Sequence, residues 1–299
     1  WVVWVFRAQI AVVYVHAGLA KVQADWLLHA QPLSIWMSAR TDLPVIGPWL
    51  GAPGVAYFMA WAGCLYDLTI VGWLSWRRTR ALAYGAVLAF HAATHVLFDI
   101  GMFPFIMSAA APIFFAPDWP RRLLRRPPVT TPRRTLPAPA RWIPWATALW
   151  LTFQALWPLR SHLLDGDVLW DDRGMRFAWK VMVREKQGSV SYRVQVAERA
   201  RPYLVSPARY LTWRQHSEMA SRPEMIAQLA HHVAHDLTAR GLTPQAVYAD
   251  AWVSLNGRPP ARLLDPTVNL LRLDASHPGW IRPAPPEPPL AAVVTARSL

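Results

Sequence analysis

The chain has 299 residues, of which 54% are hydrophobic and 18 are tryptophan, and it carries a formal net charge of +13. So apolar a composition favours a membrane protein over a soluble basic protein. The one cysteine, Cys64, excludes an intrachain disulfide. The first residue, Trp1, already lies inside an apolar run, so we interpret the sequence as a fragment that lacks its N-terminal part.

Five apolar segments have the length and polarity of membrane-spanning helices. They run over residues 1–20, 55–76, 81–98, 102–117 and 142–159. The fourth segment is short and contains Pro104 and Pro112 in its interior, which predicts a kink or a partly re-entrant path. We therefore predict that residues 1–159 form an integral membrane α-helical bundle, with about five helices in this fragment.

The arginines are distributed unevenly over the loops between these segments. The loop at 77–80 and the loop at about 118–141 together hold ten arginines, whereas the loop at 22–54 holds one. By the positive-inside rule the two arginine-rich loops are cytoplasmic, and residues 160–299 lie on the opposite side. The arginines thus act as topology signals, and we expect no nucleic-acid partner.

After residue 160 the pattern changes to that of an extracytoplasmic, strand-rich α+β domain, over residues 160–275. The segments 175–185 and 189–198 alternate apolar and polar residues around the letters KQG, which predicts a β-hairpin. Residues 222–241 have helical periodicity and a closing glycine. Residues 247–266 predict a strand, an Asn-Gly turn and a return strand. The proline-rich tail, 276–299, lacks core-forming residues and is expected to be disordered.

Three groups of polar residues lie within or beside the predicted spans, where polar side chains are energetically unfavourable. They are Arg7, Tyr14 and Lys21 on one face of the first segment, Asp67 in the second, and the stripe of His91, His95 and Asp99 in the third. A lysine at the centre of an inserted helix costs about 2.5–3.5 kcal/mol. Lys21 therefore either reaches for the lipid headgroups, with Trp26 as an interfacial anchor, or has a chemical role.

Histidines provide two further candidate sites. His91 and His95 have the i, i+4 spacing of metal ligands, but no further ligand set accompanies them. Structural hydrogen bonds or the lining of a polar cavity is the better interpretation, and we expect no metal. The histidines at 231, 232 and 235 are expected on the solvated face of a soluble helix. From the residues alone, an enzyme, a transporter and a lipophile-binding module all remain open.

Five blocks of the sequence resemble the vitamin K-dependent γ-glutamyl carboxylase family, and they occur in the family's order. VYVHAGLAKVQADW (13–26) is similar to the segment with the family's active-site lysine, and FHAATHVLFDIGMFPFIM (90–107) to its histidine-containing helix followed by IGMF. PDWPRRLL (117–124) resembles its W-P-R motif, FAWKVMVRE (177–185) its glutamate-binding region, and VYADAWVSLNGRPPARLLDP (247–266) a strand–turn block. The membrane part also resembles the horizontally transferred transmembrane (HTTM) domain group of bacteria, which contains this family.

The resemblance implies a reaction and a set of site residues. The γ-C–H of glutamate is a very weak acid, and the family uses the oxidation of reduced vitamin K to its epoxide to generate a strong base. The active-site lysine, matched by Lys21, deprotonates the quinol, for which it must be neutral; an apolar site favours that form. The implied catalytic residues are Lys21 and His91. The implied binding residues are Tyr14, His95, Asp99 and Met102 for the quinol, and Phe177, Trp179, Met182 and Arg184 for the glutamyl substrate.

The implied cofactor is reduced vitamin K or a related quinol, with O2 and CO2 as co-substrates, and the implied partner is a glutamate-containing protein or peptide. The low cysteine content and the many arginines and alanines favour a multi-pass protein of the bacterial inner membrane. Two alternatives remain. One is an enzyme that oxidises or epoxidises a quinol but acts on a different substrate, and the other is a non-catalytic membrane module that binds a lipophile.

Overall fold

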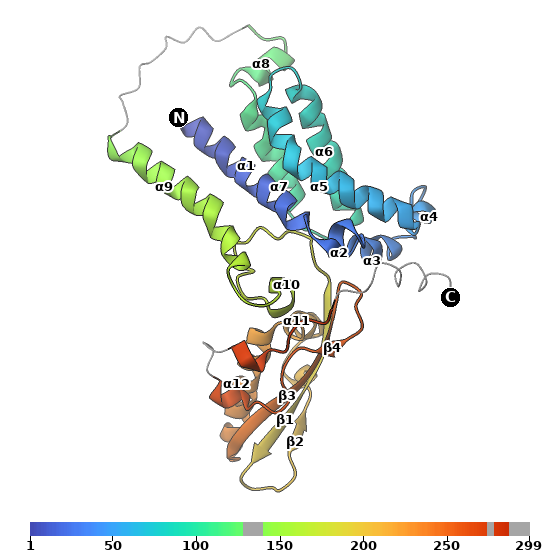
Figure 1. Cartoon of the computed structure of the whole chain (residues 1–299), viewed down its shortest axis with the longest axis vertical. Coiled ribbons are helices and arrows are strands. Elements are labelled where there is room, and N and C mark those ends of the chain that lie inside the picture. Colours follow the sequence, from blue (N-terminus) through green and yellow to red (C-terminus); the bar gives the residue numbers. More distant parts are fainter. Residues whose placement is uncertain (128–139, 274–277, 287–299) are drawn as a thin grey trace. The chain divides into compact units, whose positions relative to one another are not determined.

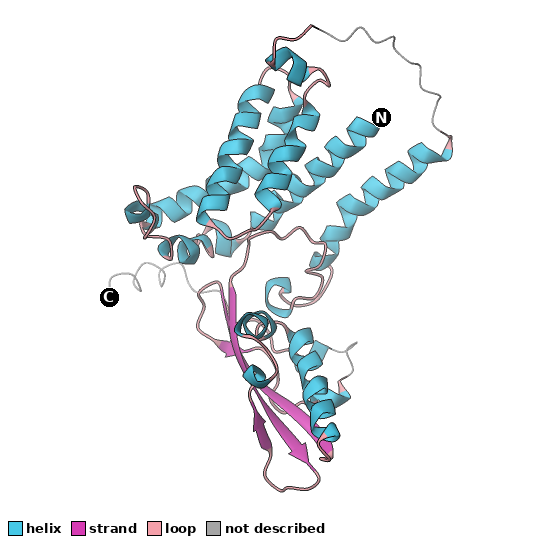
Figure 2. Ribbon diagram, turned by 180° about the vertical axis from the view of Figure 1, so that it is seen from behind, coloured by secondary structure: helices cyan, strands magenta, loops and turns pink. Residues whose placement is uncertain are grey.

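The structure is a computed structural model that describes residues 1–127, 140–273 and 278–286. Part of the arginine-rich loop expected at 118–141 and most of the tail expected at 276–299 therefore lie outside the described residues. Within the described part, one region of the chain is built from helices alone and another carries all the strands (Figures 1 and 2).

The chain divides into two compact units. The first, which we call the helical unit, comprises Trp1–Arg160 together with the short segment Phe177–Val181. The second, which we call the sheet unit, comprises Ser161–Arg176 and the residues from Met182 onwards. A helical N-terminal part followed by a domain with a small antiparallel sheet confirms the predicted fold class at this level.

All five apolar segments form helices in the helical unit. They are α1 (Val2–Lys21), α5 (Pro53–Ser75), α6 (Arg80–Leu97), α7 (Phe103–Ala110) continued by the 3-10 helix η1 (Ala111–Phe114), and α9 (Trp142–Leu156) continued by η2 (Trp157–His162). The change from α7 to 3-10 geometry coincides with Pro112, which lacks the backbone N–H that an α-helix would require there. The helix expected at 102–117 is thus irregular, as its prolines predicted.

Two helices in the described residues, α1 with 20 residues and α5 with 23, are long and apolar enough to cross a membrane. The helices α6 and α9 are shorter, at 18 and 15 residues, so the predicted number of spans stays a prediction. The helix α9 contains no buried residue, and its Trp145 and Leu149 side chains are 79% and 73% exposed. Exposed apolar surface of this kind is typical of a region that contacts lipid or a partner.

Short helices occupy the connections of the helical unit. They are α2 (Ala24–Leu27), α3 (Leu33–Ser38) and α4 (Gly47–Leu50) between α1 and α5, and α8 (Trp119–Leu123) after η1. The expected 22–54 loop is therefore a folded segment with its own buried residues, among them Trp26 and Met37. This segment follows Lys21 directly and covers the end of α1.

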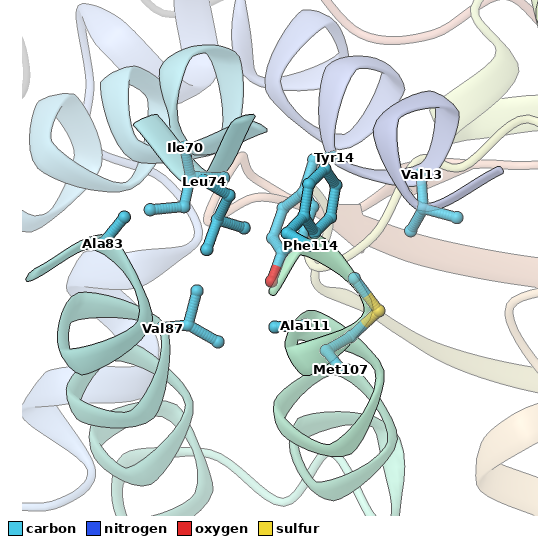
Figure 3. Close-up of a cluster of buried hydrophobic side chains, with 9 residues drawn as sticks. All are labelled: Val13, Tyr14, Ile70, Leu74, Ala83, Val87, Met107, Ala111 and Phe114. Carbon is cyan, nitrogen blue, oxygen red and sulfur yellow. The ribbon is translucent and has the colours of Figure 1, made fainter. Parts of the chain in front are cut away.

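One apolar cluster joins the principal helices of the helical unit (Figure 3). It combines Val13 and Tyr14 of α1 with Ile70 and Leu74 of α5, Ala83 and Val87 of α6, and Met107, Ala111 and Phe114 of α7 and η1. Figure 3 shows the Tyr14 ring inside this cluster, between the side chains of α5 and those of α7. Trp179, from the short segment that joins this unit later in the chain, also packs against the cluster.

The sheet unit contains a four-stranded antiparallel sheet with the order β2-β1-β3-β4. The strands are β1 (Lys186–Val196), β2 (Tyr203–Val205), β3 (Pro244–Leu255) and β4 (Ala261–Arg262). The helices of this unit are α10 (Val168–Asp171), η3 (Pro207–Arg209), α11 (Trp213–Met219), α12 (Pro223–Ala239), η4 (Leu270–Arg272) and η5 (Pro278–Trp280).

The core of the sheet unit lies between the sheet and α12, which covers one face (Figure 2). Buried Val190, Tyr192 and Val194 alternate with exposed residues along β1, as expected for a sheet with one covered face. On α12, Ile226 and Val233 are fully buried, whereas its three histidines are exposed, as predicted. The predicted helix at 222–241 is confirmed.

The Asn-Gly turn is also confirmed. Asn256 and Gly257 have φ angles of 49° and 78°, as an Asn-Gly turn requires, and Arg258 N donates to the Leu255 carbonyl oxygen at 2.9 Å across the turn; the chain then returns beside β3 as β4. Residues expected in the tail take part in this unit, because Ile281 forms a β-bridge with Leu264. The C-terminal boundary of the folded domain therefore lies beyond the expected residue 275.

The hairpin predicted over 175–198 is wrong in its first half. Residues 175–185 form no strand, because Phe177, Trp179 and Met182 have φ angles of 58°, 52° and 55°. Such left-handed backbone is incompatible with an extended strand. The alternation of apolar and polar residues here belongs to a series of turns, which direct successive side chains to different sides.

The expected KQG turn is instead the beginning of β1. Gly188 lies in the strand and pairs with Val253 of β3. A Cβ atom at this position would lie 2.5 Å from the carbonyl oxygen of Ala220, so glycine is needed here for a close approach of backbones. The glycine thus marks tight packing rather than a reversal of the chain.

A second close approach joins α1 to α5. A Cβ atom on Gly18 would lie 2.7 Å from Leu68 Cδ2 and 3.0 Å from the Leu68 backbone nitrogen. The buried thiol of Cys64 in α5 lies 3.8 Å from the Gly18 carbonyl oxygen, so this cysteine packs at the contact of the two helices. Gly18 therefore allows the two helices to meet one turn before Lys21.

We predict that Gly18→Ala lowers the stability of the helical unit by about 1–3 kcal/mol, because the added methyl group pushes α1 from α5. Gly72→Ala is the matched control, since a Cβ atom on Gly72 in α5 meets nothing within 4 Å. Thermal unfolding of both purified proteins in the same detergent measures the effect. Equal melting temperatures for the two variants would contradict a packing role for Gly18.

Candidate active site

The polar residues on one face of α1 have separate partners. Arg7 donates from Nε to the carbonyl oxygen of Ile113 at 2.9 Å and from Nη2 to that of Phe114 at 3.1 Å. Its guanidinium also lies 4.9 Å from the centre of the Trp4 ring. Arg7 therefore satisfies the carbonyl groups at the end of η1, which have no partner within that helix, and its role is structural.

Lys21, at the end of α1, forms a buried ion pair with Asp67 of α5. The distance from Lys21 Nζ to Asp67 Oδ2 is 2.7 Å, and each side chain is 7% exposed. The ammonium also donates to the carbonyl oxygen of Ala17 at 3.2 Å. A buried charge of this kind is tolerated where it is paired and hydrogen-bonded, as it is here.

The folded segment after α1 closes this site. Lys21 Nζ lies 5.3 Å from the centre of the Trp26 ring, within the range of a cation–π interaction. Trp26 is itself buried and donates from Nε1 to the carbonyl oxygen of Ala60 at 2.8 Å. Lys21 therefore points into the protein and does not extend to the surface, and Trp26 is part of the enclosure rather than an exposed anchor.

Tyr14 and His91 form a second polar pair within the same bundle. The Tyr14 hydroxyl lies 3.1 Å from His91 Nε2, and the two residues are 2% and 3% exposed. Tyr14 lies two turns before Lys21 on α1, or about 10 Å along the axis. The structure thus brings together Tyr14 and His91, which are far apart in the sequence.

Aromatic rings surround His91 on several sides. Phe90 and Tyr66 stack at 4.0 Å, and the rings of Tyr66 and Phe103 lie edge-on to the His91 imidazole at 6.5 and 6.3 Å. The second imidazole nitrogen, Nδ1, is buried and has no hydrogen-bond partner among the described residues. A buried polar atom without a partner is energetically unfavourable, so it marks a position where a ligand oxygen would be stabilised.

The other residues expected to bind the quinol are not part of this group. His95, one turn after His91, is exposed and its ring contacts Phe105 at 4.8 Å. Asp99 is exposed, and Met102 is 67% exposed. The stripe expected from the spacing of four is cut short, because α6 ends at Leu97: only His91 and His95 lie on this helix, and of these only His91 is buried.

The four residues expected to bind the glutamyl substrate fall into both units. Phe177 and Trp179 belong to the helical unit, whereas Met182 and Arg184 belong to the sheet unit. Phe177 is 78% exposed, and Trp179 and Met182 are half-buried. The left-handed backbone at Phe177, Trp179 and Met182 redirects the chain repeatedly over this short stretch.

Arg184 is already engaged by an acidic residue. It forms an ion pair with Asp172, and its Nη1 donates to the carbonyl oxygen of Leu169 at 3.3 Å. Lys186 Nζ approaches the other oxygen of Asp172 at 3.0 Å and donates to the carbonyl oxygen of Trp170. Burial lowers the pKa of Lys186 from 10.5 to about 8, against the opposing effect of Asp172.

Two acidic residues important to this arrangement were not among the expected site residues. Asp67 had a signal in the sequence, because a carboxylate inside an apolar helix requires a cation and Lys21 is the lysine nearest to such a segment. Asp172, in a polar loop, had no such signal. Among the described residues there is no group of three or more His, Cys, Asp or Glu side chains that could hold a metal ion.

The comparison with known families gives two matches that together cover most of the chain. A model of the HTTM domain, a membrane-associated family, matches residues 1–119. A model of the vitamin K-dependent gamma-carboxylase lumenal domain matches residues 140–287. No solved structure matches the chain.

The lowered pKa of Lys186 leads to a prediction about the pH dependence of stability. Its folded-state pKa of about 8 lies below the ordinary value of 10.5, so the unfolded chain binds more protons between these values. The contribution of Lys186 to the free energy of unfolding therefore rises by about 3 kcal/mol between about pH 8 and about pH 10.5. Below pH 8 the full cost of burying the charged amine is present.

Lys186→Met should remove this rise, and Gln187→Met, an exposed neighbour in β1, should retain it. Denaturant unfolding of both variants at a series of pH values, followed by circular dichroism at strand wavelengths, measures the difference. A pH dependence of equal size in both variants would show that Lys186 is not the titrating group.

Proposed function

Since the chain belongs to the vitamin K-dependent gamma-carboxylase family, we propose that it carboxylates the γ-carbon of protein glutamate residues while oxidising a quinol to its epoxide. The observation that carries this proposal is the buried pair of Lys21 and Asp67. Lys21 occupies the lysine position of the block HAGLAKVQADW, which resembles the family's active-site segment. Burial of that lysine beside Asp67, with each side chain 7% exposed, supports its assignment as the reactive amine.

The weak acidity of the substrate determines what chemistry this site must support. The γ-C–H of a glutamyl residue is far too weak an acid for a protein side chain to deprotonate at a useful rate. Reduced vitamin K or a related quinol, when bound, supplies with O2 the strong base that this step requires. The buried, unpartnered nitrogen of His91 and the hydroxyl of Tyr14 fit the oxygen atom of such a quinol.

In this proposal Lys21 accepts a proton from a quinol hydroxyl. It can do so only as a neutral amine, and Asp67 holds the adjacent acceptor, 2.7 Å from Nζ. Transfer of one proton from Nζ to Oδ2 converts the ion pair into an amine and a carboxylic acid. A low-dielectric site favours this neutral pair more than water does, because two buried charges lose their hydration.

Asp67 is therefore a positioning residue in this scheme, and a temporary proton store for Lys21. It holds Nζ at the end of α1 and gives the Lys21 proton a destination that does not require solvent. Tyr14 and His91 orient the ligand oxygen, and His91 is the second candidate base because imidazole is neutral near pH 7 without special surroundings.

A second candidate function is oxidation of a quinol without carboxylation of glutamate. The ion pair of Arg184 with Asp172 favours this alternative, because the guanidinium expected to bind a substrate carboxylate already has one. Labelled CO2 distinguishes the two functions. Incorporation of label into a glutamyl peptide supports carboxylation, and epoxide formation without incorporation supports the alternative.

We further propose that the chain is a multi-pass protein of a bacterial inner membrane, with the sheet unit outside the cytoplasm. The ten arginines in the loops at 77–80 and 118–141 support this orientation. In a Cys64→Ala background, Arg201→Cys should react with an impermeant thiol reagent added to intact cells, and Thr130→Cys should not. Labelling of Thr130→Cys from outside would reject the proposed topology.

The roles of Lys21 and Asp67 can be separated by substitution. Lys21→Ala and Lys21→Arg should each lower kcat for epoxide formation and for CO2 fixation by about 10²–10⁴-fold. Arginine retains the positive charge beside Asp67 but does not lose its proton, so it restores the ion pair without providing a base. Partial rescue of Lys21→Ala by a small primary amine would support the same role.

The measurements are quinol-dependent epoxide formation and incorporation of labelled CO2 into a glutamyl peptide. The control is Cys64→Ala, a buried neutral substitution in α5 that should leave both rates near wild type. Asp67→Asn should lower kcat and alter its pH profile if Asp67 serves as proton store. Normal epoxide formation in Lys21→Arg would limit the lysine to a structural role.

A further inference from the structure

The helical unit contains a pocket away from the Lys21–Asp67 pair, with a volume of about 310 Å³. We call it the aromatic pocket. Its walls come from Trp150 and Phe153 on α9, from Trp157 on η2, and from Phe177 and Trp179 on the segment that joins the helical unit later in the chain. This volume lies at the lower end of the range typical of small-molecule sites.

The lining of the aromatic pocket is chemically simple. Apart from the rings and one proline, its sole polar contributor is Gln154, whose Oε1 lies 3.5 Å from Gln9 Nε2 on α1. None of the side chains that line it is ionisable. Such a pocket binds apolar groups by burial and by contact with ring faces, and it offers no group to accept or supply a proton.

Trp179 connects this pocket to the polar residues of the bundle. It forms a wall of the aromatic pocket and also packs against the apolar cluster that contains Tyr14. The hydroxyl of Tyr14, in turn, contacts His91. A ligand whose oxygen atoms require Lys21, Tyr14 and His91 would therefore have its proton-active part among these residues and its inert part in the aromatic pocket.

The outer side of α9 makes the aromatic pocket accessible to a lipid-soluble ligand. This helix buries no residue, and Trp145 and Leu149 on it are strongly exposed. The end of α9 that lines the pocket thus continues into a surface that suits a lipid environment. A long apolar chain could follow this surface into the pocket without crossing water.

We infer that the aromatic pocket holds the prenyl tail of the quinol, so that Phe177 and Trp179, which the resemblance assigned to the glutamyl substrate, contact the quinol instead. This inference rests on the proposed function. It adds to that function the location of the apolar part of the ligand. The tail is preferred to the quinol ring because the pocket has no proton-transfer group, whereas the ring oxygens need one. It is preferred to a lipid acyl chain because the same tryptophan borders the pocket and the cluster around Tyr14.

The test is equilibrium binding to the full chain in lipid nanodiscs, with a radiolabelled prenylated naphthoquinone and its tail-less methyl analogue as probes. Trp150→Ala and Phe153→Ala should each raise the Kd of the prenylated probe about tenfold, which corresponds to about 1.4 kcal/mol. Neither should change the Kd of the tail-less probe more than about twofold. Trp145→Ala, on the same helix but outside the pocket, is the matched control.

A second measurement does not depend on substitution. A prenylated naphthoquinone with a photoreactive group near the end of its tail should label peptides that contain residues 150–157 or 177–179. Excess unlabelled prenylated naphthoquinone should suppress this labelling, although phospholipid is present in excess throughout. Labelling that the quinone does not suppress would mean that lipid acyl chains occupy the pocket, and would overturn the inference.

Further outcomes separate a failure of the pocket assignment from a failure of the proposed function. An equal loss of affinity for both probes would place the ring in the pocket, and an unchanged Kd for the prenylated probe would exclude the pocket; either overturns the inference. Tail-dependent binding in a wild-type chain that forms neither epoxide nor carboxylated peptide would support the inference and reject the proposed function. Lys21→Ala should keep the difference in Kd between the two probes, because it removes a contact of the ring oxygens and not the tail site.

Discussion

The ion pair between Lys21 and Asp67 is the constraint on which the helical unit depends. Two charges in apolar surroundings are tolerable only as a pair, and removal of one partner from such a pair typically costs about 3–5 kcal/mol. The pair therefore requires α1 and α5 to lie at one fixed separation and register. Gly18 permits that separation, because any Cβ atom there would meet Leu68. Trp26 then closes the site from the segment that follows α1. The local sequence HAGLAKVQADW thus contains the glycine, the lysine and the tryptophan that this single contact needs.

The polar residues of α1 separate into those with structural partners and those with partners capable of proton exchange. Arg7 binds backbone carbonyl groups of η1, and His16 donates to the carbonyl oxygen of Ala155 at 3.0 Å. These contacts satisfy backbone groups and hold helices together, and they include no second titratable side chain. Lys21 and Tyr14 instead face side chains that can exchange a proton, Asp67 and His91. The number of polar residues in an apolar helix is thus a poor measure of its chemistry, and the nature of their partners is a better one.

The segment 177–185 contributes to both units through unusual backbone geometry. Three left-handed residues in six positions allow the chain to present Phe177 and Trp179 to the helical unit and then to continue into the sheet unit, where Arg184 meets Asp172. A regular strand would send alternate side chains to two faces of one sheet and would not serve two units. Strained backbone of this kind persists where surrounding contacts determine it, and it is frequent at functional sites.

The sequence by itself determined the helical segments, the Asn-Gly turn and the helix over 222–241, and it singled out Lys21 as a charge in apolar surroundings, because each rests on local periodicity, turn chemistry or the energy of one buried charge. It did not determine the path of residues 175–188. There the same alternation fits a strand and a series of left-handed turns, and Gly188 fits a turn and a close packing contact. It also could not show that His91 is buried while His95 is exposed, because two residues four apart share a helix face but not their neighbours. The partners of Lys21 and Arg184 lie 46 and 12 residues away along the chain. Only the tertiary structure decided those pairings, because the free energy of a charge depends on what packs around it.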